Sequence, residues 1–268
     1  MKTAPQFLAV AVMLAASPAF AQSDAPAATG PAPAPATAAI EPEAVAALQK
    51  MGAYLRSLKS FTVRGDSTLD MVTEDGQRLE FPGTVEYQVR TPDAMTVSLK
   101  TDRKDRKLYY NGKQLTLHGA TNHYYATIDA PPTIRELLAT AYDDYGLELP
   151  LVDLFLWGTD RAPKSALTSA TVVGPARIGG TATEQYAFRQ EGVDWQVWIE
   201  PGSRPLPRRM VITTTDDPAR PQYASTLTWN TNATLAPDSF TFKPGQEDKR
   251  IELVRAVVAE KSNPEGRP

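Results

Sequence analysis

The chain has no cysteine among its 268 residues. This absence excludes disulfides, thiolate chemistry and cysteine-rich metal sites. It also excludes the lipid that bacterial lipoproteins carry on a cysteine just after the signal peptide. A chain of this length can bury a large core without disulfides. We therefore expect a mature protein that is stabilised by packing and carries no lipid.

Histidine is scarce, and basic residues are not in excess. The histidines are His118 and His123, and no nearby cysteine or carboxylate completes a metal-ligand pattern, so we expect two solvated turn residues and no metal. No phosphate loop, dinucleotide fingerprint or serine elbow is present, which predicts no cofactor. The 28 basic and 31 acidic residues give a net charge of −3. Nucleic acids and anionic membranes both demand basic patches, so neither is an expected partner.

Long apolar runs are also absent. Residues 7–16 are the apolar core of a signal peptide, and Ala19-Phe20-Ala21 predicts cleavage before Gln22. No later run is long enough to span a membrane. We therefore expect a signal peptide over 1–21, a disordered Ala/Pro-rich linker over 22–41, one domain over 42–258 and a disordered tail over 259–268. The expected product is a soluble, unlipidated periplasmic monomer.

Residues with a period of two dominate the chain and predict antiparallel strands. The segment VDWQVWIEPGSRPLPRRMVITTT is the clearest case, because Pro201-Gly202 separates two alternating runs. About eleven such segments are expected, at 61–72, 78–90, 94–100, 106–110, 113–118, 123–128, 169–178, 181–190, 193–200, 208–215 and 222–231. A sheet of this size with few helices curls into a barrel or half-barrel.

Three segments have helical spacing instead. Apolar residues recur every three or four positions over 43–58, which predicts an amphipathic helix. Thr133 and Glu136 form a capping box, and Gly146 is a suitable helix end. These two signals delimit one helix between them. A further, shorter helix is expected over 150–157, and it is apolar on most sides apart from Asp153. These helices need the sheet as a partner, so we expect them on its concave side.

Six stretches of the chain resemble one family. They are AALQKMGAYLRSLKSFTV, YYNGKQLTL, YYATIDAPPTIRELL, YGLELPLVDL, AFRQEGVDWQVWIEPGSRPLPRRMVITT and PQYASTLTWN, within residues 43–253. The family is that of predicted periplasmic proteins called domain of unknown function 2092, which is similar to the superfamily of LolA, LolB and LppX. The resemblance implies a LolA-like unclosed antiparallel β-barrel, with a helical lid over an apolar cavity that accepts acyl chains.

Two groups of residues are candidates for the site. The predicted cavity residues are apolar and lie in the helical insert or the Trp-rich strand: Leu138, Leu151, Leu154, Phe155, Trp157, Trp195 and Trp198. For each tryptophan, packing in the core is the alternative to lining the cavity. Trp195 and Trp198 point to opposite faces of their strand, so at most one of them can line a given cavity. The second group is a lid latch, in which Asp153 pairs with an arginine of the sheet: Arg189, Arg208 or Arg209. The alternative is an exposed Asp153.

The expected function is binding or carriage of an apolar or acylated ligand, such as a lipid or a lipoprotein acyl chain. Two alternatives stay open. One is an interaction or regulatory module that holds an envelope protein partner on the same concave sheet. The other is a hydrolase in which Asp143, Asp144 or Asp153 form a general acid/base pair. No catalytic residue is predicted, because a helix end for Asp143 and Asp144 and an ion pair for Asp153 explain these aspartates better than catalysis does.

Overall fold

The computed structural model describes residues 39–255, apart from 148, 158 and 160–165, and without the side chain of Asp153. The predicted signal peptide over 1–21 and tail over 259–268 lie outside the described residues and remain predictions. Every described residue belongs to the unit that spans 37–268. Among these residues, no helix is both long and apolar enough to span a membrane.

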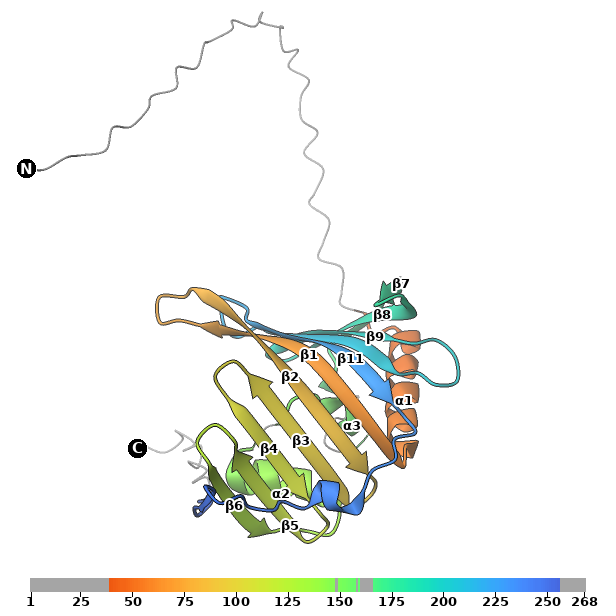
Figure 1. Cartoon of the computed structure of the whole chain (residues 1–268). Coiled ribbons are helices and arrows are strands. Elements are labelled where there is room, and N and C mark those ends of the chain that lie inside the picture. The colour runs from red at the N-terminus through yellow and green to blue at the C-terminus, as the bar shows by residue number, and fades with distance from the viewer. Residues whose placement is uncertain (1–38, 148, 158, 160–165, 256–268) are drawn as a thin grey trace, which may run out of the picture. The chain divides into compact units, whose positions relative to one another are not determined.

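Twelve strands form one sheet (Figure 1). Their order is β12-β6-β5-β4-β3-β2-β1-β11-β10-β9-β8-β7, so β12 and β7 are unjoined edges and the barrel is unclosed. The strands are β1 (Ser60–Val72), β2 (Arg78–Arg90), β3 (Ala94–Thr101), β4 (Asp105–Tyr110), β5 (Gln114–Gly119), β6 (Tyr124–Asp129), β7 (Ser169–Ile178), β8 (Thr181–Gln190), β9 (Val193–Ile199), β10 (Pro207–Thr214), β11 (Gln222–Asn230) and β12 (Lys249–Arg250). The predicted fold class is confirmed. The two-residue β12 is an addition to the expected eleven strands, and it pairs with β6 in parallel.

Two of the predicted helices form where expected. α1 (Pro42–Ser57) buries Leu48, Met51 and Leu55 in the core. α2 (Ile134–Tyr145) is capped at Thr133, whose side chain accepts a hydrogen bond from the backbone N–H of Glu136 at 3.2 Å. It ends at Gly146, which adopts a left-handed φ of 60°. The capping box and the glycine therefore act as the sequence indicates.

The third predicted helix is wrong in extent. α3 (Asp153–Leu156) is a single turn, whereas a helix over 150–157 was expected. Leu151 has a φ of 66°, a left-handed conformation that cannot belong to a right-handed helix. The hydroxyl of Tyr87 on β2 donates to the carbonyl of Pro150, so the sheet holds this connection in a non-helical path.

The core lies on one face of the sheet and joins all three helices. Phe61 and Val63 on β1 and Val97 on β3 are buried there together with Leu55 of α1 and Leu137 of α2. Alternate residues of the strands point to the opposite face. The helices thus cover the face that the apolar pattern selects.

The end of the predicted linker runs beside the edge strand β7. The Ala170 N–H donates to the Ala39 carbonyl at 3.1 Å, and the Glu41 N–H donates to the Ala170 carbonyl at 2.8 Å. The Glu41 carboxylate also accepts from the Val172 N–H at 2.8 Å. These bonds cover the start of an otherwise unpaired edge.

Candidate functional site

An apolar cavity of about 290 Å³ lies where α1, α2 and α3 meet strands β1 to β3. We call it the Phe155 cavity. Its lining is Leu55, Arg56, Phe61, Tyr87, Val89, Thr91, Pro92, Met95, Thr133, Ile134, Arg135, Leu138, Phe155, Leu156 and Thr159. The floor is made of buried side chains from the sheet, and α2 and α3 contribute partly exposed ones. The result is a preformed apolar space with access from outside.

Phe155 is the aromatic centre of this cavity. Its ring stacks on Phe61 with centroids 5.6 Å apart, and it lies 6.5 Å from Tyr87 and 6.3 Å from Trp229. The spacings to Tyr87 and Trp229 lie in the upper half of the range for paired rings. The side chain is only partly buried. Phe155 therefore contacts the floor without filling the cavity.

The segment that carries Phe155 is anchored by backbone contacts. Arg56 of α1 donates from its guanidinium to the carbonyl of Trp157. Gly52, one turn earlier on α1, lets this carbonyl approach closely, because a Cβ at Gly52 would lie 2.7 Å from it. The Arg56 anchor was not foreseen from sequence. An arginine at the C-terminal end of a helix is usually explained by its interaction with the helix dipole. Only the tertiary structure brings the carbonyl of a distant residue to it.

Trp157 lies in a filled part of the same face. It is 5% exposed, and its ring stacks on Trp195 of β9 at 4.8 Å. Trp195 in turn stacks on Phe188 of β8 at 4.2 Å and donates from its indole N–H to Gln190 at 3.0 Å. Trp195 is thus 4% exposed, with two ring partners and a hydrogen-bonded indole N–H.

The predicted cavity residues divide into three groups. Leu138 and Phe155 line the Phe155 cavity. The others that lie on the core face are buried in the adjoining core: Leu151, Leu154, Trp157 and Trp195. Trp198 does not line this cavity. It points to the opposite face of β9, where the Arg209 guanidinium lies 5.8 Å from its ring centroid.

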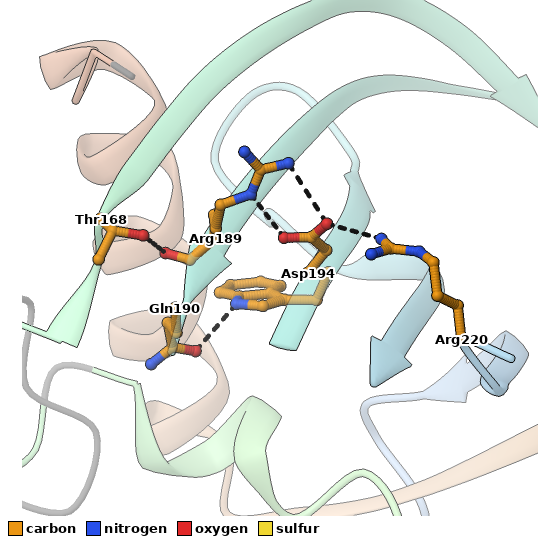
Figure 2. A network of polar contacts seen from close by, with 6 residues as sticks. Thr168, Arg189, Gln190, Asp194 and Arg220 are labelled. Atoms are coloured by element: carbon orange, nitrogen blue, oxygen red, sulfur yellow. Dashed lines mark hydrogen bonds and ion pairs between the residues drawn. The ribbon is translucent and has the colours of Figure 1, made fainter. Parts of the chain in front are cut away.

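The predicted latch arginines hold other partners. Figure 2 shows Arg189 on the carboxylate of Asp194, with Nε to Oδ1 at 2.7 Å, and Arg220 on the same carboxylate at 3.0 Å. Hydrogen bonds from Arg189, the nearer of the two, hold the pKa of Asp194 below its ordinary value. Arg189 and Asp194 face away from the core, on the side of the sheet opposite α3.

Arg208 and Arg209 are engaged as well. Arg208 pairs with Glu200, and Arg209 donates to Thr226 at 3.0 Å besides covering Trp198. The side chain of Asp153 lies outside the described residues. Because Arg189 and Arg209 occupy the other face, neither is placed to latch α3. The described anchor of this segment is Arg56.

The expectation of two solvated turn residues is wrong for His118, which lies on β5, and holds for His123, a turn residue whose side chain is 50% exposed. His118 has a side chain only 14% exposed, packs on Phe242 at 4.7 Å and bonds through Nε2 to Asp248 at 2.9 Å. His123 lies 3.7 Å from the same carboxylate. A backbone hydrogen bond from Gly245 and the bond with His118 lower the pKa of Asp248. Only folding brings these segments together, since Asp248 lies far along the chain.

The described residues provide no metal cluster and no carboxylate pair in the cavity. No group of three or more His, Cys, Asp or Glu in this part of the chain is arranged to hold a metal. Asp143 is exposed on α2, and Asp144 forms an ion pair with Arg255 at 3.7 Å. Neither lines the Phe155 cavity. The charged residues that do line it are Arg56 and Arg135.

Comparison with solved structures finds similar folds at low sequence identity. The Mycobacterium tuberculosis lipoprotein LppX is 12% identical, with a TM-score of 0.46, and the match covers 73% of this chain and 100% of that one. A LolA superfamily protein from Nitrosomonas europaea is 9% identical, with a TM-score of 0.34 and coverages of 74% and 97%. The Pseudomonas aeruginosa MucA/MucB complex gives 12% identity, a TM-score of 0.43 and coverages of 78% and 63%. At these values, function has to be argued from the residues of this chain.

Comparison with families is decisive, although no curated protein matches the chain. The model of the family described as predicted periplasmic protein, DUF2092, matches residues 44–254. This description agrees with the predicted periplasmic localisation. The match covers all twelve strands and all three helices apart from the first two residues of α1, and the chain therefore belongs to the DUF2092 family.

Proposed function

We propose that this protein is a periplasmic, non-catalytic binding or carrier protein for an apolar or acylated ligand, such as a lipid or a lipoprotein acyl chain. The Phe155 cavity is the observation that carries the proposal. Its volume of about 290 Å³ is close to that of small ligand sites. Its walls are mostly hydrocarbon, with threonines and arginines at the edge.

Burial of hydrocarbon supplies the driving force in such a site. Each methylene moved from water into an apolar cavity contributes about 0.8 kcal/mol. Phe61, Met95 and Leu138 offer contact surface without polar groups that would need partners. A flexible acyl chain meets this requirement better than a polar substrate would.

The same lining argues against the hydrolase alternative. A carboxylate-dependent hydrolase needs two acidic side chains around a polar substrate. Among the described lining residues of the Phe155 cavity there is no Asp or Glu. Asp143 and Asp144, considered for this role, lie elsewhere on α2.

A fluorescence titration with a fatty-acyl probe tests the proposal. Wild-type protein should bind the probe saturably, and native mass spectrometry of protein from its own periplasm should show a retained lipid. Phe155→Asp should abolish binding and destabilise the fold, because it places a charge among aromatic rings. Trp198→Asp is the matched control on the opposite face and should keep binding. Absence of saturable binding to any acyl probe or lipid extract would refute the carrier proposal.

One observation favours the alternative of a polypeptide partner. The β1–β2 hairpin carries exposed apolar residues on the face that continues the core face, namely Leu69, Met71 and Leu79, and Met71 is 55% exposed. An apolar peptide segment could lie on this extension of the concave sheet. A Met71→Lys, Leu79→Lys double variant should lose such a partner and keep acyl binding. If acyl binding is absent and a purified envelope protein binds in a manner that this variant abolishes, the interaction role replaces the carrier role.

A further inference from the structure

A second cavity of about 380 Å³ lies on the core face of β3 to β6. We call it the far cavity. Its sheet lining includes Leu108 and Leu117, and its cover comes from two other segments. Leu147 and Leu149 belong to the connection between α2 and α3, and Leu253 follows β12. The far cavity and the Phe155 cavity lie on the same face of the sheet.

Strand β3 links the two cavities. Met95 lines the Phe155 cavity, whereas Val97 and Leu99 line the far cavity. These three residues alternate along one strand, so their side chains point to the same face. At about 3.3 Å per residue, Met95 and Leu99 lie roughly 13 Å apart. The cavities are therefore placed end to end along one strand rather than on separate parts of the molecule.

Charge is distributed unevenly over the linings. The Phe155 cavity has Arg56 and Arg135 in its lining, and the far cavity has Arg106, Lys107 and His118, the last bonded to Asp248. No Asp or Glu lines either cavity among the described residues, although acidic residues outnumber basic ones in the whole chain. Arg135 and Arg106 form no ion pair with a described carboxylate, and the described contact of Arg56 is with a carbonyl.

Guanidinium groups that meet no described carboxylate and lie beside hydrocarbon match an anionic amphiphile. A guanidinium offers several donors in one plane and binds carboxylate or phosphate oxygens with two of them. Arg56 and Arg135 flank the same cavity from α1 and α2. An anionic head group there would leave its acyl chain directed over the apolar floor.

We propose that the two cavities form one elongated site for a long-chain anionic amphiphile. Arg56 and Arg135 hold the head group, and the chain follows β3 past Val97 into the far cavity. This inference rests on the proposed function and adds the class of ligand. Each methylene that reaches the far cavity then strengthens binding by about fourfold, which makes affinity strongly dependent on chain length.

Chain length provides the first test. Octanoate and palmitate compete with a fluorescent acyl probe for wild-type protein and for Leu117→Phe, which narrows the far cavity. Leu99→Phe is a second variant of the same cavity, and thermal melts establish that each variant is folded. Palmitate should bind wild-type protein much more tightly than octanoate. Both variants should weaken the binding of palmitate by ~tenfold or more and leave the affinity for octanoate unchanged, because only the longer chain loses buried methylenes.

Leu138→Trp, in the Phe155 cavity, is the matched comparison and should weaken both probes. Equal affinity of the two probes for wild-type protein, or equal losses in Leu117→Phe and Leu99→Phe, would overturn the elongated site and leave the proposed function standing. Failure of both probes to bind wild-type protein would overturn the proposed function itself.

Head-group charge provides the second test. Arg135→Gln should weaken palmitate and lysophosphatidylglycerol by ~tenfold and leave neutral monopalmitoylglycerol unchanged. Arg64→Gln is the control, since Arg64 pairs with Asp66 and Glu86 outside both cavities. Tighter binding of palmitate identifies a free carboxylate as the ligand group, and tighter binding of the lysophospholipid identifies a lipid phosphate. If Arg135→Gln lowers the affinity for the neutral lipid as much as the affinity for the anionic ones, the anionic head-group site is overturned.

Discussion

Phe155 and Trp157 are two residues apart on one short segment, yet they meet the sheet in different ways. Trp157 belongs to a filled stack, with Trp195 at 4.8 Å and Phe188 beyond it at 4.2 Å from Trp195. Phe155 has ring neighbours at 5.6 Å or more and faces a cavity of about 290 Å³. One end of the segment is packed and the other remains open.

The difference follows from where the backbone is anchored. Arg56 and Gly52 bring the carbonyl of Trp157 against α1, so its side chain is pressed between helix and sheet. Phe155 has no such backbone contact among the described hydrogen bonds with α1, and α2 meets the sheet further along. Close packing and open volume are therefore separated along this face of the sheet.

Removal of the filled stack should have the largest effect. Trp195→Ala is expected to lower the free energy of unfolding by about 3–5 kcal/mol, because it leaves a void in a packed core. Trp198→Ala removes the same side chain from the opposite face, where its described ring contact is with Arg209, and should cost about 1 kcal/mol. Urea unfolding measures both. Equal losses of unfolding free energy in the two variants would show that the stack is no better packed than the outer face.

Removal of the ring at the open end should cost less. Phe155→Ala is expected to lower the free energy of unfolding by about 1.5–3 kcal/mol, because the transfer term is lost but a cavity already adjoins the site. Trp157→Ala should cost more in the same urea experiment. The Phe155→Ala variant should also change acyl-probe affinity more than Trp157→Ala does. The reverse order in either measurement would contradict the division between filled and open ends.

Loss of the anchor should loosen the segment without emptying the core. Arg56→Met removes the hydrogen bond to the Trp157 carbonyl, and the expected loss is about 0.5–1.5 kcal/mol. Amide hydrogen exchange over residues 153–157 should become faster. Arg135→Met is the control, because Arg135 lines the same cavity but makes no described bond to this segment. Unchanged exchange in Arg56→Met would show that the anchor is not needed.

The smallest effect is expected at the outer-face cluster of Arg189, Asp194 and Arg220. The pKa of Asp194 is lowered in the folded protein, so its contribution is present above its ordinary value of 3.8 and is lost as the pH falls through the folded pKa. Because the arginines are exposed, the contribution is about 1 kcal/mol or less. Asp194→Asn should show a correspondingly flatter fall in stability below pH 3.8 in urea unfolding. A fall as steep as that of wild-type protein would remove Asp194 from the account of acid unfolding.

Local sequence signals determined the elements of this protein. The alternation of apolar and polar residues predicted the eleven longer strands, because side chains of a strand point to opposite faces in turn and only one register buries the apolar face. The capping box at Thr133 and the glycine at 146 set the limits of α2, since both act through their own neighbours. Proline was less informative. Pro150 is typical of a helix start, but the left-handed Leu151 and the bond from Tyr87 prevent a helix there.

The site depended on contacts that have no local signature. Leu138 and Phe155 were predictable as apolar residues near a cavity, but Leu151, Leu154 and Trp157 have the same character and are packed in the core. Which apolar side chain lines a cavity depends on how closely two distant segments approach.

The charged residues show the same limit. Arg189 was a reasonable partner for Asp153 by type, and register placed it instead beside Asp194 on the other face. Local sequence patterns thus predicted the compartment, the strands of the sheet and the helices α1 and α2, because these arise within a few residues of chain. The tertiary structure alone decided that Arg56 anchors α3, that His118 meets Asp248, and where the core stays open, because each of these joins segments far apart in the sequence.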